Sequence, residues 1–489
     1  MNDSAQKKKN LLFYPLGTIG RDMMYSLFTN FILLYIMYTK GLTNEQLGAV
    51  TAIMVAARVF DAFNDPIMGN IIERTRTKIG KYKPWLIAGV LSTCVVIYLA
   101  FNTDLTGWNF IIFFGIIYFM YSITYTMNDI SYWGMIPALS QDTNSRNQFT
   151  SRATLFAGIG GTLASLLIPI FTTGKFTIGG SANVAYGRIA LIICILAPLF
   201  MLFTIFGVKE RRDETAAPPI SFKKIVNTIW GNDQLRWMVV IFLCQQIGNA
   251  VVVGGIGSSY IYFRFGYEGG LYSLFSTVGL MATAFLMIFY PMISRKINRK
   301  PLMKILMLVS TFGCILELVA GFILPDNMIG FWGITLGYMF ANFGLYGFYL
   351  IMMISIINTV EYNEYTRGVR DEAIITSMRP FLTKLASAIV VLLTSLTYLL
   401  FRVTTYTNQI SELETRVQKG VLTEAEKTQA ITQVIAGVKP GQTTGLMLAM
   451  VLIPYIFMLA SYLLYKKFYK LDEDEYARIC AELDAKKAP

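Results

Sequence analysis

Long apolar segments dominate this 489-residue sequence and limit its fold more than any other feature. A helix needs about 20 apolar residues to cross a bilayer, and only helices and closed barrels satisfy their backbone hydrogen bonds there. Segments that reach or approach this length lie at 11–39, 44–71, 84–102, 108–137, 152–173, 188–208, 236–265, 271–293, 302–324, 328–358, 374–402 and 442–466. Only 15% of the residues are charged, whereas a soluble protein has about 25%. The sequence therefore predicts an all-α membrane protein with twelve transmembrane helices.

The distribution of charge predicts the orientation of these helices. Basic residues concentrate in alternate connections, at 7–9, 74–83, 146, 209–224, 295–300, 367–370 and 466–470. Short connections rich in Lys and Arg stay in the cytoplasm, so both termini are predicted to be cytoplasmic. The net charge of +12 is thereby explained by topology. A lipid bilayer, and not a nucleic acid, is the expected partner.

Two similar halves are indicated by the connections. A polar middle loop at 209–235 separates six spans in 1–208 from six spans in 236–470, and a tail at 471–489 follows in the cytoplasm. The basic loop 74–84 of the first half has a counterpart at 295–301 in the second. Duplicated six-helix units of this kind rock around a central site in secondary transporters. On the alternative reading, both loops are topology signals only.

A polar insertion at 403–441 is predicted to lie outside. Thr423 and Glu426 fit a capping box that opens a helix, which Gly437 and Pro440 then stop. This helix would either cover the outer mouth in part or be a solvated decoration. We favour the decoration, because surface loops tolerate insertions.

Enzyme chemistry is not indicated. The sequence contains no histidine, which excludes a histidine proton relay and any Ser–His or Cys–His nucleophile pair. Its five cysteines have no spacing typical of a metal site or a disulfide framework. We therefore predict a protein that is not an enzyme and has no cofactor.

Two carboxylates, Asp61 and Asp65, lie four residues apart within the second apolar segment. Charges inside a membrane span are costly and usually mark an ion or proton pathway. Their spacing places them on one helix face, and Asn64 adds an amide oxygen nearby. Hard cations such as Na⁺ favour clusters of oxygen ligands. Alternatively, Arg58 forms a structural ion pair with Asp61, but one arginine neutralises only one of the two carboxylates.

A stripe of aromatic and acidic residues marks the fourth span. Tyr121, Tyr125, Asp129 and Trp133 follow at intervals of four and so share a helix face. Sugars stack their apolar faces on aromatic rings, and their hydroxyl groups bind carboxylates and arginines. The stripe therefore favours a sugar ligand, although the tyrosines alone would also suit helix packing.

Three acidic residues lie at a similar predicted depth. Asp22, Asp61 and Asp129 are each a few residues to the cytoplasmic side of the middle of their spans, so we expect them to meet in one cavity. The predicted counter-charges are Arg58, Arg152 and Lys384. Thr126, three residues before Asp129, faces sideways and would add an oxygen to an ion at Asp61 and Asp65. The alternative is a hydroxyl that bonds to its own helix backbone.

These motifs resemble a known family. The stretches 61–69 and 74–85, together with 128–133 and 361–365, are similar to the glycoside–pentoside–hexuronide:cation symporters. These are melibiose-permease-like members of the major facilitator superfamily, whose fold has two pseudo-symmetric six-helix bundles. The resemblance implies a cation site made by Asp61, Asn64, Asp65 and Thr126. It implies sugar contacts from Asp22, Tyr125, Asp129, Trp133, Arg152 and Tyr349, with Lys384 as the lysine of the eleventh helix near the cation site.

The expected function is import of a small glycoside, pentoside or related sugar by symport with Na⁺ or H⁺. The resemblance implies a bacterial cytoplasmic membrane and a protein that acts as a monomer. Two alternatives remain, a cation-coupled exporter of amphipathic compounds and a sugar sensor that does not transport. The choice between Na⁺ and H⁺ stays open, because a protonated Asp in the same site would also suit coupling.

Overall fold

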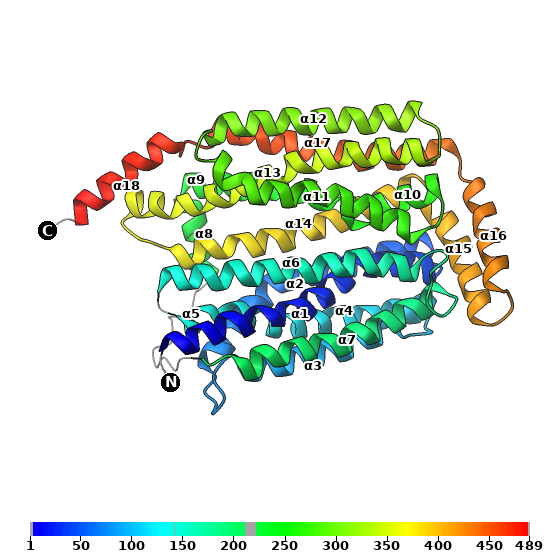
Figure 1. Ribbon diagram of the computed structural model, residues 1–489, viewed down its shortest axis with the longest axis horizontal. Helices are drawn as coiled ribbons and strands as arrows, with labels where there is room; N and C mark the ends of the chain where they lie inside the picture. Colours follow the sequence, from blue (N-terminus) through cyan, green and yellow to red (C-terminus); the bar gives the residue numbers. More distant parts are fainter. Residues whose placement is uncertain (1–2, 141, 211–221, 488–489) are drawn as a thin grey trace. The chain divides into compact units, whose positions relative to one another are not determined.

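The computed structural model describes residues 3–140, 142–210 and 222–487, and a long helix occupies nearly every predicted span (Figure 1). The membrane-length helices are α1 (Asp3–Thr39), α2 (Asn44–Arg74), α3 (Lys83–Phe101), α4 (Gly107–Gly134), α6 (Thr143–Thr172), α7 (Ala182–Gly207), α11 (Gly269–Ile293), α12 (Arg299–Ile323), α13 (Met328–Arg367), α14 (Glu372–Leu400) and α17 (Pro440–Phe468). The remaining span, predicted at 236–265, is a broken helix.

Within the described part of the chain, eleven helical segments are long and apolar enough to cross a membrane. The broken helix is one of these segments, and α1 is not, because Arg21, Asp22 and Asn30 lower its mean hydropathy. With α1, the prediction of twelve spans in an all-α membrane protein is confirmed.

The broken helix consists of α9 (Asp233–Ala250), the π-helical turn η1 (Val252–Ile256) and α10 (Gly257–Phe265). Gly255 in the turn has a φ of 130°, a conformation that suits only glycine. The sequence predicted one continuous span here, because its apolar character does not change across the break.

Short helices occupy regions predicted as loops. The turn α5 (Ile136–Leu139) follows α4, and α18 (Glu473–Lys487) forms most of the predicted tail. In the predicted middle loop, α8 (Phe222–Gly231) is helical, while residues 211–221 lie outside the described residues.

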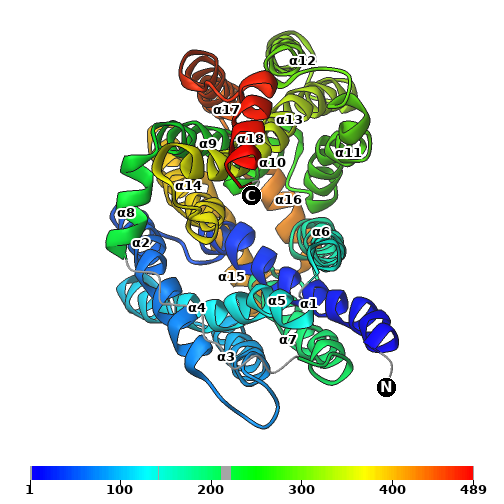
Figure 2. The same ribbon diagram turned by 90° about the vertical axis from the view of Figure 1, so that its left-hand side faces the viewer.

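The chain forms two compact units. Unit 1 comprises Met1–Pro219, Gly266–Leu274 and Tyr398–Val438, and unit 2 comprises Ile220–Phe265, Phe275–Thr397 and Lys439–Pro489. In unit 1, α1 packs against α6 and α7, while α4 packs against α2 and α3 (Figure 2). In unit 2, α12 packs against α13, and α9 packs against α13 and α17.

The predicted outer insertion is a hairpin of α15 (Val403–Gln418) and α16 (Glu424–Ala436) that belongs to unit 1. The Glu414 carboxylate is buried and accepts a hydrogen bond from the backbone N–H of Ala182 at 2.8 Å. The Lys427 ammonium donates to the carbonyl of Gly180 at 2.6 Å and lies 3.3 Å from Glu414. The hairpin is therefore anchored to the α6–α7 connection by buried polar groups, and the choice between a cover of the outer mouth and a decoration stays a prediction.

The predicted start of α16 is confirmed. The Thr423 hydroxyl accepts from the backbone N–H of Glu426, whose carboxylate accepts from the backbone N–H of Thr423. The helix ends before Gly437, as predicted, whereas Pro440 is the first residue of α17.

Candidate functional site

Helix α4 presents polar residues on two adjacent faces within unit 1. One face carries the stripe predicted from the sequence and points to α1, while Ser122 and Thr126 point to α2. Successive residues of an α-helix are about 100° apart around the axis. A shift of one residue, from Tyr121 to Ser122 or from Tyr125 to Thr126, therefore moves the contact from α1 to α2.

The first face forms what we call the α1–α4 cluster, made of Arg21, Asp22 and Asp129. The guanidinium of Arg21 lies 2.8 Å from Oδ2 of Asp22 and 2.7 Å from Oδ1 of Asp129. The Arg21 side chain is only 3% exposed, while the two carboxylates are 19% and 28% exposed. One buried cation thus holds two carboxylates that remain in part accessible.

Aromatic rings surround this cluster. The guanidinium carbon of Arg21 lies 5.1 Å from the centre of the Trp133 ring, and the rings of Tyr25 and Tyr125 are 5.4 Å apart. Further along the stripe, Tyr121 stacks on Phe28 with 3.6 Å between ring centres. Trp133 and Tyr125 are therefore next to the charges, whereas Tyr121 is a packing residue.

A reciprocal contact fixes α1 against α4 close to Arg21. The Tyr14 hydroxyl donates to the carbonyl of Tyr132, and the Tyr132 hydroxyl donates to the carbonyl of Tyr14, both at 2.7 Å. The two rings also stack with centres 4.5 Å apart. This double contact holds Asp129, one turn before Tyr132, in register with α1.

The second face forms the α2–α4 cluster, made of Asp61, Asn64, Asp65, Ser122 and Thr126. The Asp61 carboxylate accepts a hydrogen bond from the Ser122 hydroxyl, and the Asp65 carboxylate accepts one from Thr126 at 3.0 Å. The Asn64 amide donates to the carbonyl of Ser122 at 3.4 Å. Carboxylate, amide and hydroxyl groups thus converge on one helix interface, and their role as a cation site stays a prediction.

Arg58 stands beside the α2–α4 cluster. Its guanidinium lies 3.7 Å from Asp61 and 5.9 Å from the centre of the Tyr118 ring. Its Nε is buried and has no hydrogen-bond partner among the described residues. The ion pair considered as the alternative to an ion site is thus present, but it is long.

Two residues of these clusters were not predicted. Arg21, which was not among the predicted counter-charges, forms ion pairs with Asp22 and Asp129. Ser122 is the hydroxyl partner of Asp61. A signal existed for Ser122, because it precedes Thr126 by four residues and so shares its face.

Arg152 lies apart from the α1–α4 cluster. It is exposed on α6 and donates to the carbonyl of Leu11 at 3.2 Å. Leu11 precedes Arg21 by ten residues, which is about 15 Å along a helix. A sugar contact from Arg152 stays a prediction.

Tyr349 and Lys384 belong to unit 2. The Tyr349 ring on α13 lies 5.9 Å from the guanidinium carbon of Arg379 on α14 and 5.3 Å from the Tyr346 ring. Lys384 follows Arg379 by five residues on α14. The roles given to Tyr349 and Lys384 by the resemblance stay predictions.

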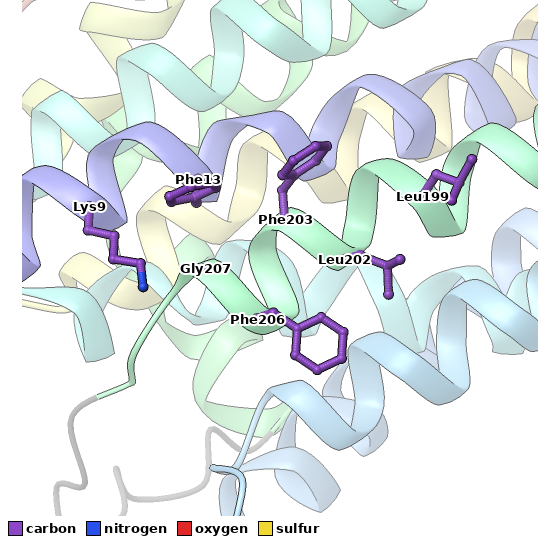
Figure 3. Close-up of a pocket in the computed structure, with 7 residues that line it drawn as sticks. All are labelled: Lys9, Phe13, Leu199, Leu202, Phe203, Phe206 and Gly207. Atoms are coloured by element: carbon purple, nitrogen blue, oxygen red, sulfur yellow. The ribbon is translucent and has the colours of Figure 1, made fainter.

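An apolar hollow of about 500 Å³ lies on the surface between α1 and α7 (Figure 3). Its lining contains one charged side chain, Lys9, together with phenylalanines and leucines such as Phe206, which is 77% exposed. Exposed apolar side chains on a membrane helix suit contact with lipid. We therefore place the polar chemistry of unit 1 at the two clusters on α4.

Comparison with known proteins gives matches along most of the chain. The profile of the family described as MFS/sugar transport protein matches residues 13–473. The lactose permease of Lactobacillus helveticus is 27% identical over 417 residues, which are 80% of this chain and 62% of that protein. The putative glycoside/cation symporter YagG of Escherichia coli (strain K12) is 27% identical over 282 residues, which are 57% of this chain and 59% of that protein.

The chain thus spans about three-fifths of the length of these curated relatives, at 62% and 59%. Among solved structures, a bacterial homologue of the human lysosomal transporter Spinster, in an inward-facing and unoccupied conformation, superposes with a TM-score of 0.61. It is 12% identical, and the match covers 95% of this chain and 97% of that one. This likeness concerns the fold.

Proposed function

This chain belongs to the family of MFS/sugar transport proteins, and from that premise we propose that it imports a small glycoside or related sugar together with a monovalent cation. The observation that supports this proposal is the pair of charged clusters on adjacent faces of α4. Relatives named as a lactose permease and a putative glycoside/cation symporter support the same two ligands.

The α1–α4 cluster is the proposed sugar site. Arg21 engages Oδ2 of Asp22 and Oδ1 of Asp129, so the second oxygen of each partly exposed carboxylate is available to accept from sugar hydroxyls. Hydrogen bonds to charged groups are strong and directional. The rings of Trp133 and Tyr125 offer apolar surfaces beside them for stacking.

The α2–α4 cluster is the proposed cation site, and we take Na⁺ as the ion. Its side chains bring carboxylate, amide and hydroxyl oxygens to one interface, which is the ligand type that hard cations use. A proton would need only one carboxyl group. The number and kinds of oxygen therefore favour Na⁺.

The coupling follows from the helix that the two clusters share. Thr126 and Asp129 are three residues apart on α4, which is about 4.5 Å along its axis. A cation that ties α2 to α4 would therefore fix the position of Asp129 against α1. By linkage, each ligand would then raise the affinity of the protein for the other by the same factor.

The setting is the cytoplasmic membrane of a bacterium. Basic residues in alternate connections support cytoplasmic termini. We further propose that the halves at 1–208 and 236–470 act as two bundles of one monomer that alternates between outward and inward access.

Uptake into proteoliposomes tests the function. The purified protein is given a labelled panel of mono- and disaccharides that includes lactose, under an inward Na⁺ gradient, an inward proton gradient or neither. We expect uptake of one sugar class above the level of empty vesicles, driven by Na⁺. Uptake driven by protons alone would overturn the choice of ion, and binding without flux would favour a sensor over a transporter.

A further inference from the structure

A further acidic residue in a membrane helix, Glu317, lies in unit 2 and has surroundings unlike those of both clusters. It sits on α12 and is 2% exposed. Its Oε1 atom has no hydrogen-bond partner among the described residues. A buried carboxyl oxygen without a partner is rare in folded proteins and calls for an explanation.

Glu317 borders a small cavity within unit 2. The cavity has a volume of about 10 Å³, which is close to the room that one water molecule needs. Its lining includes the polar residues Ser310 and Tyr455 and two positions where helices are irregular, Val252 in η1 and Pro454 inside α17. Pro454 has no N–H for the carbonyl four residues earlier, so backbone as well as side-chain oxygen is near.

No ion pair of Glu317 occurs among the described residues. The titratable groups near it on the packed helices are Tyr260 of α10, Tyr338 of α13, Tyr455 of α17 and Cys314 of α12 itself, and Arg264 of α10 donates to the Tyr260 hydroxyl. Arg264 is the cation of this set, and its Nε lies 2.6 Å from Asp326. It also donates to the carbonyls of Gly321 and Leu324, so its hydrogen bonds satisfy backbone groups at the C-terminal end of α12.

An ionised carboxylate in this place would lack the compensation that buried charges need. A neutral carboxylic acid avoids most of that cost, and its O–H also supplies a donor for the cavity. A metal cation fits less well, because the cavity holds about one water and Glu317 is its one carboxylate.

We propose that Glu317 is a proton-binding site, a carboxylic acid that holds one proton per chain and bonds to a single water in the cavity. This site is on α12 and is separate from the proposed Na⁺ site on α2 and α4. It therefore adds a second exchangeable cation, a proton, to the protein. Its test does not depend on transport.

Infrared spectroscopy of the purified protein tests the proton directly. We expect the carbonyl band of a protonated carboxylic acid at neutral pH, shifted in D₂O, in the wild type but not in Glu317→Gln. Glu317→Asp should keep the band, and this variant replaces Glu317→Gln in the test if the glutamine variant does not fold. Glu412→Gln, which removes an exposed carboxylate of α15, is the control and should keep the acid band. If Glu317→Gln keeps the acid band and loses intensity in the carboxylate bands, Glu317 is ionised in the wild type and the proposal is overturned.

Thermal unfolding gives an independent readout. Glutamate in an unfolded chain ionises near pH ~4.3, whereas the folded protein would keep Glu317 neutral to higher pH. The wild type therefore loses stability relative to Glu317→Gln as the pH rises above that value, by up to about tenfold per pH unit in the unfolding constant. We expect the Tm difference, Glu317→Gln minus wild type, to grow from pH 5 to pH 9, which is roughly the range above the pKa of glutamate in the unfolded chain. A gap that stays constant or shrinks with pH would contradict a bound proton.

Discussion

The α1–α4 cluster and the α2–α4 cluster lie at adjacent faces of α4 and contain two carboxylates each, and they differ in what lies next to the negative charge. In the first, a buried guanidinium is 2.8 and 2.7 Å from the carboxylates. In the second, the hydroxyl groups of Ser122 and Thr126 donate to Asp61 and Asp65, and the guanidinium of Arg58 lies 3.7 Å from Asp61. A hydroxyl group satisfies a carboxylate oxygen but does not cancel its charge.

This difference fits the proposal that one helix serves two ligands. A cluster that contains its own cation stays assembled and can bind a neutral ligand through its remaining oxygens. At Asp61 of the second cluster the guanidinium is more distant, which leaves negative charge that a mobile cation can balance. The comparison predicts that changes in the first cluster affect folding and sugar, while changes in the second affect the ion.

The largest effect is expected from Arg21→Gln. It leaves two carboxylates of the α1–α4 cluster without their cation, and breaking a buried ion pair costs about 3–5 kcal/mol. We expect a large fall in Tm and loss of sugar binding by calorimetry. Arg21→Lys, which keeps the charge but not the two-sided geometry, should be intermediate. Wild-type stability and sugar affinity in Arg21→Gln would refute the role of this cluster.

Asp65→Asn should have the next largest effect, and on the ion alone. The change removes a charged oxygen of the α2–α4 cluster, so we expect the Na⁺ affinity to fall at least about tenfold, a loss of about 1.4 kcal/mol. Sugar affinity without Na⁺ should stay the same. Na⁺ titrations of Tm, with Asp129→Asn as the matched control, measure both effects. If Asp129→Asn lowers Na⁺ affinity as much as Asp65→Asn does, the two clusters are not separate sites.

Sequence patterns predicted the helices better than their contacts. Apolar length placed the spans to within a few residues for most helices, because a membrane helix has to bury its own backbone hydrogen bonds. The break at Gly255 was missed, since glycine is common in membrane helices and leaves the apolar pattern unchanged. Spacing alone does not distinguish a break from close packing.

The candidate site was predicted in the same uneven way. Intervals of four identified Asp61 with Asp65 and the stripe on α4, because such residues share a face whatever the tertiary fold. The choice of Arg21 as partner for Asp129 depends on how α1 packs against α4, which a single sequence does not reveal. The same holds for α15, whose buried residues include Val403, Thr407, Ile410 and Glu414. Their helical spacing indicates one buried helix face, but it does not indicate which other part of the chain covers that face.

A smaller effect is expected from the hydroxyl groups of the second cluster. Thr126→Val keeps the shape of the side chain and removes one hydrogen bond to Asp65, worth about 0.5–1.5 kcal/mol. We expect the Na⁺ affinity to fall about 2- to 10-fold and the sugar affinity to stay unchanged. Thr124→Val is the matched control, because the Thr124 hydroxyl bonds to the carbonyl of Tyr121 within α4. Equal effects of the two variants on Na⁺ affinity would assign the loss to helix packing.

The smallest effect separates packing from binding within the aromatic stripe. The Tyr121 hydroxyl is buried and has no hydrogen-bond partner among the described residues, and its ring stacks on Phe28. Tyr121→Phe keeps that stacking, so stability should change by no more than about 0.5 kcal/mol and sugar affinity should not change. Tyr125→Phe removes a hydroxyl beside the charges of the α1–α4 cluster and should weaken sugar binding measurably by calorimetry. A loss of sugar affinity in Tyr121→Phe that matches the loss in Tyr125→Phe would extend the sugar site along the stripe, beyond the α1–α4 cluster.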